Sequence, residues 1–164
     1  KVDDIKAWLF GAGESDLVFS FQDDKKYTAQ VVNAIDFKQV YRYFSEFQII
    51  FNCRPFKYAV ENNIETINTS GAKVTNSGTI ESEPVINIYG RGDIKLKIND
   101  DEITIKNVDE YVTINSVLKD AYKDEVLKNG DMIGEFPLFK VGENIISFSG
   151  NVSKIEVEIN EAWI

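Results

Sequence analysis

Residues 81–108 read ESEPVINIYGRGDIKLKINDDEITIKNV, and this stretch predicts the fold class. From Ile94 to Ile98, isoleucine and leucine alternate with lysine, and from Ile103 to Lys106 isoleucine alternates with threonine and lysine. Successive side chains on a strand point to opposite faces, so each run has one apolar and one polar face. Such strands are typical of an antiparallel sheet with one buried face. No catalytic motif accompanies this pattern, which favours a protein that works by shape and surface.

The remainder of the C-terminal part has closely spaced turn signals between strand-like runs, which indicates a β-sandwich. Arg91-Gly92-Asp93 is the tripeptide that integrins recognise, but Gly90 and Gly92 favour a plain hairpin turn. Ser116 to Gly134 is expected to be a helical turn or a long loop. Strands are expected at residues 64–68, 72–75, 80–89, 93–98, 102–108, 111–114, 144–149 and 152–159.

The N-terminal part predicts a short amphipathic helix from Val2 to Phe10, with acidic residues in its first turn. A buried strand from Leu17 to Phe21 and a polar turn at residues 22–26 are expected next. Two runs rich in aromatic and β-branched residues, 27–37 and 43–55, are expected to pair as an antiparallel hairpin. Pro55 is expected to end that hairpin or to lie at an edge.

The composition excludes several function classes. The chain has 164 residues, no histidine and one cysteine, and its 18 basic and 27 acidic residues give a net charge of -9. This charge argues against nucleic acid, because neutralising phosphates needs clustered lysine and arginine. The lack of histidine removes the commonest general base and metal ligand. Cys53 follows an apolar run and is interpreted as a buried small hydrophobe. We expect no membrane insertion, metal or cofactor.

Two kinds of candidate site remain, and each has a plainer interpretation. Adjacent carboxylates such as Asp100-Asp101-Glu102 could serve a glycosidase or bind calcium, but paired acids in polar turns are usually only solvated. Tyrosine and tryptophan rings could stack on a sugar, although aromatic residues in strands more often pack with each other. The candidate sugar contacts are Tyr89, Tyr111 and Trp163. We assign no catalytic residue and do not expect an enzyme.

The order of these elements resembles the siphophage distal tail protein family over nearly the whole chain. The most specific patterns are CRPF at residues 53–56, SEPVI at 82–86 and FPLFKVGENIISFSG at 136–150. The resemblance implies a mainly β protein in two parts. Residues 1–60 correspond to the C-terminal part of an α+β ring-forming domain, a short helix plus a β-hairpin, without its opening strands. Residues 61–164 correspond to a galectin-like antiparallel β-sandwich.

The family resemblance also implies a function, namely a structural hub that joins the tail tube to the baseplate or receptor-binding proteins. Expected partners are further copies of the protein in a ring, the tail tube protein, a tail-associated lysin and receptor-binding or baseplate proteins. The implied location is the virion tail, after assembly in the host cytoplasm. A carbohydrate-binding module that recognises a cell-surface glycan is the alternative function.

The aromatic residues of the expected hairpin exceed what so small a part of the chain needs for its own core. They could form the contact between copies, because lasting interfaces between subunits bury about 2,000 Å² or more of largely apolar surface. They could equally pack internally, and the sequence leaves both possibilities open. The candidate interface residues are Tyr27, Val31, Tyr41, Tyr43 and Phe47.

Overall fold

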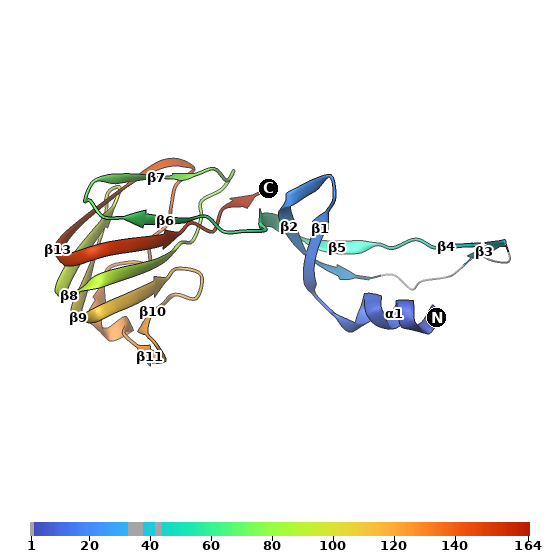
Figure 1. Ribbon diagram of the computed structural model, residues 1–164, viewed down its shortest axis with the longest axis horizontal. Coiled ribbons are helices and arrows are strands. Elements are labelled where there is room, and N and C mark those ends of the chain that lie inside the picture. Colours follow the sequence, from blue (N-terminus) through green and yellow to red (C-terminus); the bar gives the residue numbers. More distant parts are fainter. Residues whose placement is uncertain (1, 33–37, 42–43) are drawn as a thin grey trace. The chain divides into compact units, whose positions relative to one another are not determined.

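The computed structural model describes residues 2–32, 38–41 and 44–164, and the chain divides into two compact units, Lys1–Val60 and Glu61–Ile164 (Figure 1). The first unit begins with helix α1 (Val2–Gly11), which confirms the expected helix. Asp3 and Asp4 lie in its first turn, where each carboxylate stabilises the helix by about 0.3–1 kcal/mol through the helix dipole. Gly13 has a φ of 62° and turns the chain toward the first strand.

The sheet of the first unit contains three strands side by side in the order β1 (Ser15–Phe19), β2 (Gln22–Val31) and β5 (Phe51–Ala59), all antiparallel. The expected hairpin is confirmed for the described residues, because β2 pairs with β5. The expected polar turn at residues 22–26 is wrong, since these residues begin β2 and the turn lies at Ser20 and Phe21. Farther along the hairpin, β3 (Lys38–Tyr41) pairs with β4 (Phe44–Glu46), and residues 33–37 lie outside the described part.

Pro55 does not end the hairpin, because it lies inside β5. The pairing of β2 with β5 shifts between Tyr27 and Ala29, whose partners are Lys57 and Cys53. Pro55 therefore lies in a bulge, where a strand residue needs no N–H group for the hydrogen-bond ladder.

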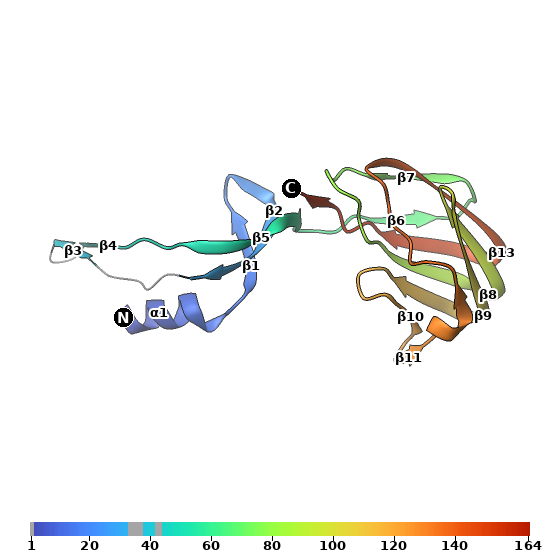
Figure 2. The same cartoon turned by 180° about the vertical axis from the view of Figure 1, so that it is seen from behind.

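The second unit is an antiparallel β-sandwich, which confirms the expected mainly β fold. Figure 1 shows β13 (Gly142–Glu158), β8 (Val85–Ile98) and β9 (Asp101–Asn115) side by side, and Figure 2 shows β10 (Asp120–Lys123) and β11 (Val126–Leu127) beside β9. Its strands follow the order β11-β10-β9-β8-β13-β6, while β12 pairs with β9 and β7 pairs with β13. The elements are β6 (Ile64–Ile67), β7 (Ala72–Asn76), β8 (Val85–Ile98), β9 (Asp101–Asn115), β10 (Asp120–Lys123), β11 (Val126–Leu127), the 3-10 helix η1 (Asn129–Asp131), β12 (Met132–Ile133), β13 (Gly142–Glu158) and β14 (Ala162–Trp163).

Six of the expected strands merge in pairs into β8, β9 and β13. The glycines that suggested turns instead lie at bends inside continuous strands. Gly92 has a φ of 79°, and the register of β8 with β9 shifts between Gly92 and Ile94. The prediction of a hairpin turn at Arg91-Gly92-Asp93 is therefore wrong, because the tripeptide lies inside the continuous strand β8, opposite a bulge in β9. Strands that bend in this way can contribute to both layers of a sandwich.

The core of the second unit joins both halves of the bent strands. Ile88, from the first half of β8, and Leu96, from the second half, are fully buried in the same cluster. Phe139 and Ile155, from other segments of the chain, belong to the same buried cluster. The segment from Ser116 to Gly134, expected as a turn or loop, instead contains three short strands and η1.

Candidate functional site

The first unit has an unusually exposed apolar surface. Ala29 and Val31 are its only buried hydrophobic side chains among the residues whose burial is described. By contrast, Trp8 is 75% exposed and Phe21 is 83% exposed. Cys53, expected to be buried, is exposed on β5, although its partner across the sheet, Ala29, is buried. Large exposed apolar patches usually mark interaction sites.

Helix α1 packs on one of the two faces of the first sheet. The face with Ala29 and Val31 lies under α1, and a pocket of about 260 Å³ remains between the helix and the sheet. Trp8, Leu17 and Phe51 line this pocket. The strand registers place Val18, Lys26 and Tyr58 in one row on the opposite face. We call this second face the bare face.

The bare face carries apolar side chains with one ion pair among them. Val18 is 44% exposed, Tyr58 is 38% exposed and Phe56 is 37% exposed. The ammonium group of Lys26 lies 3.0 Å from an Asp16 carboxylate oxygen. Because this pair is partly exposed to water, it contributes little to stability.

The candidate interface residues lie at different places in the first unit. Tyr27 is half-buried and its ring meets that of Phe19 edge-on, with centroids 5.9 Å apart. Val31 is buried, Phe47 is half-buried and Tyr41 lies in β3. Tyr43 lies outside the described residues. Tyr27 and Val31 thus pack within their own unit, whereas Val18, Phe56 and Tyr58, which the sequence reasoning did not select, are exposed.

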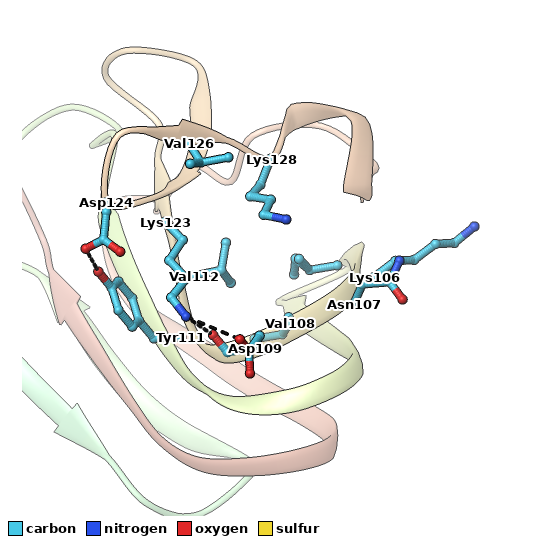
Figure 3. Close-up of a pocket in the computed structure, with 11 residues that line it drawn as sticks. Lys106, Asn107, Val108, Asp109, Tyr111, Val112, Lys123, Asp124, Val126 and Lys128 are labelled. Carbon is cyan, nitrogen blue, oxygen red and sulfur yellow. Dashed lines mark hydrogen bonds and ion pairs between the residues drawn. The ribbon is translucent and has the colours of Figure 1, made fainter.

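The second unit has a pocket of about 240 Å³ between β9 and the β10–β11 hairpin (Figure 3). Lys123 donates hydrogen bonds to the Asp109 carbonyl oxygen at 2.7 Å and to the Glu110 carboxylate at 3.2 Å. Burial lowers the pKa of Lys123, but the hydrogen bond to Glu110 and the charges of Asp109 and Glu110 outweigh burial, so the pKa is raised. Lys123 is therefore a firmly charged donor at one side of the pocket.

Tyr111 lines the same pocket and donates a hydrogen bond from its hydroxyl to the Asp124 carboxylate at 2.5 Å. This bond raises the pKa of Tyr111, because the bonded phenol is favoured over a phenolate beside a carboxylate. Figure 3 shows the Tyr111–Asp124 bond and the contacts of Lys123 with Asp109 as dashed lines. Tyr111, Asp124 and Lys123 thus hold one another in a defined arrangement.

Of the three candidate sugar contacts, the structure brings two together. Tyr89 and Tyr111 are opposite each other on β8 and β9, with ring centroids 6.0 Å apart. The ammonium of Lys154 lies 4.3 Å from the Tyr89 centroid, and that of Lys123 lies 5.5 Å from the Tyr111 centroid. Each ring therefore has a lysine over one face. Trp163 lies apart from them in β14.

Among the described residues, no group of three or more histidine, cysteine, aspartate or glutamate side chains could hold a metal ion. Within the same part of the chain, no helix is both long enough and apolar enough to span a membrane.

The fold and the two surfaces together define a mainly β protein whose chain joins a small helix-and-sheet unit to a β-sandwich. Among solved structures, the chain is similar to the crystal structure of the SPP1 Dit protein, described as a paradigm of the hub adsorption apparatus in phages that infect Gram-positive bacteria. The match has a TM-score of 0.75 and 14% sequence identity, and it covers 99% of this chain and 70% of SPP1 Dit.

The resemblance to siphophage distal tail proteins is thus confirmed at the level of the fold. No protein-family profile matches the sequence, and no curated protein matches it.

Proposed function

We propose that this protein is a structural component of a phage or prophage tail tip, a hub that joins the tail tube to baseplate or receptor-binding proteins. The observation that carries the proposal is the fold shared with SPP1 Dit over 99% of the chain. The proposed location is the virion tail, after assembly in the cytoplasm of the host.

The first unit supports a role in self-association. Its bare face exposes Val18, Phe56 and Tyr58, and α1 exposes Trp8 on the other side of the sheet. Contacts between two different surfaces of identical subunits close into a ring when the rotation between subunits allows it. Two distinct apolar surfaces on one unit suit such contacts. Tail tube protein, a tail-associated lysin and receptor-binding proteins are the further partners in this proposal.

Light scattering coupled to size-exclusion chromatography of the full-length gene product tests self-association. We expect one discrete oligomer, visible as rings by electron microscopy. Tyr58→Lys places a charge on the bare face and should shift the oligomer toward single copies. Val117→Lys is the matched control, since Val117 is 52% exposed in the other unit. A wild-type protein that stays a single copy at high concentration contradicts the self-association.

Immunogold labelling of intact virions tests the location separately. Antibodies raised against the purified protein should label the tail tip. Label on the capsid, or on no part of the virion, would rule out a tail hub.

A further inference from the structure

We propose that the pocket between β9 and the β10–β11 hairpin binds a single neutral sugar ring. This proposal does not depend on the hub role, since it concerns a site in the second unit alone. It also differs from a platform made by the ring faces of Tyr89, Tyr111 and Trp163, because only Tyr111 lines the pocket.

The backbone around the pocket adopts conformations that are rare for residues other than glycine. Asn107 and Glu110 in β9 have φ values of 53° and 65°, and Asp124 in the β10–β11 turn has a φ of 51°. The register with β8 also shifts at this point, so β9 carries an extra residue in a bulge. Bulges and left-handed residues with side chains are both enriched at functional sites. Here Asn107 and Asp124 are themselves among the residues that line the pocket.

The walls combine an apolar surface with charged groups of both signs. Val108 and Val112 are almost fully buried beneath the pocket, and Val126, which is 60% exposed, forms part of its wall. Lys123 and Lys128 supply donors. Figure 3 shows Val126 and Lys128 on the hairpin side, facing Val108 and Asp109 of β9.

The mixture of donors and acceptors selects the chemistry of the ligand. Asp109 and Asp124 repel a phosphate or carboxylate, while Lys123 and Lys128 repel an amine. A hydroxyl group both donates and accepts hydrogen bonds, so it can satisfy ammonium and carboxylate groups side by side. Tyr111 uses one of the hydrogen bonds that the Asp124 carboxylate can accept, which leaves capacity for a ligand. A ring with several hydroxyls and an apolar C–H face matches these walls.

The volume limits the size of the ligand. At about 240 Å³ the pocket is smaller than the roughly 300–1,000 Å³ of pockets that enclose drug-sized ligands. One sugar ring fits this space, and the rest of a polysaccharide would extend into solvent. A site that encloses one ring with few fixed polar groups is expected to bind weakly, with a Kd on the order of 1 mM.

Titration of the isotope-labelled full chain, followed by amide NMR signals, tests the site. The neutral probes are glucose, galactose and N-acetylglucosamine, and the charged probes are inorganic phosphate and acetate. We expect at least one neutral sugar to shift the signals of residues 107–112 and 123–128. Unchanged signals in both segments with all three sugars, or larger shifts there with phosphate or acetate, would overturn the proposal.

Two variants test the pocket wall and the donor. Val126→Asp adds a carboxylate to the apolar wall and should weaken sugar binding about tenfold or more, equivalent to roughly 1.4 kcal/mol. Val117→Asp is the control, because Val117 is similarly exposed but lies outside the pocket. The sugar affinity of the Val117→Asp variant should match that of the wild type. Lys123→Met removes the donor and should also weaken binding. Equal affinity of Val126→Asp and wild type would show that the sugar binds elsewhere.

Discussion

A β-carbon on Gly150 in β13 would lie 2.6 Å from the carbonyl oxygen of Asp93 in β8. The two long strands therefore approach each other at their bends more closely than any side chain allows. Gly150 also has a φ of 106°, a conformation that glycine adopts readily and other residues do not. The corner of the sandwich depends on this glycine for both reasons.

Gly150→Ala should destabilise the second unit by about 2–5 kcal/mol, combining backbone strain with overpacking against a fixed backbone atom. Gly142→Ala is the matched control in the same strand, since Gly142 has a φ of 88° but open space around its α-carbon. The Gly142→Ala variant should lose only the stability that corresponds to the backbone strain, about 1–2 kcal/mol. Urea unfolding, followed by Trp163 fluorescence in a Trp8→Phe background, measures both. Equal losses of unfolding free energy in the two variants would contradict the close approach of Gly150 to Asp93.

Asn144 should be far more sensitive to substitution than an exposed asparagine. It is fully buried, and its side chain accepts from the Lys140 N–H at 2.9 Å and donates to the Lys140 and Gly142 carbonyl oxygens at 2.8 and 3.0 Å. Asn144→Ala leaves these groups without partners, and each costs about 1–3 kcal/mol when buried. We expect a loss above about 2 kcal/mol by urea unfolding. Asn151→Ala, at an exposed position, should be close to neutral.

The pKa of Glu14 should rise in the Arg54→Ala variant. Arg54 donates two hydrogen bonds to the Glu14 carboxylate, at 2.6 and 2.7 Å, and these bonds lower the pKa of Glu14. A carboxyl with a lowered folded-state pKa contributes stability above its unfolded-state pKa, and this contribution is lost as pH falls through the folded value. NMR titration of the Glu14 carboxyl carbon measures the change, and Arg91→Ala, in the other unit, should leave it unaltered. An unchanged Glu14 titration without Arg54 contradicts the pairing.

Cys53 should react with a thiol reagent in the native protein. It is exposed on β5, so Ellman's reagent should titrate one thiol without denaturant, and Cys53→Ser should abolish the signal. A thiol that reacts only after unfolding would mean that the surface of the first unit is covered in solution. Protection in the oligomer and reactivity in the Tyr58→Lys variant would locate Cys53 near the contact between copies.

Much of the fold could be predicted because it depends on local patterns. The alternation from Ile94 to Ile98 places apolar groups on one face of a strand wherever that strand pairs, and Leu96 is fully buried as expected. The helix at Val2–Gly11 likewise follows from its acidic first turn and apolar spacing. The continuity of β8 through Gly92 could not be predicted, because a glycine permits a turn and a bend equally well.

The candidate site was less predictable, because its members come from distant parts of the chain. Tyr111 could be selected as an aromatic strand residue, but its bond to Asp124 and the lysine over its ring depend on the pairing of β9 with β10. Positive φ values at Asn107 and Glu110 leave no clear mark in the sequence. The exposed bare face could not be predicted either, since the same Val and Tyr pattern is typical of buried strands.

The sequence by itself determined which segments form strands and which side of each strand is apolar, because alternation is a property of neighbouring residues. Only the tertiary structure decided which apolar sides are covered. Ile88 and Leu96 lie in one core because β8 bends between them, whereas Cys53 and Tyr58 of β5 remain exposed among the described residues. Burial is decided by contacts between distant segments, and those depend on how the whole chain packs.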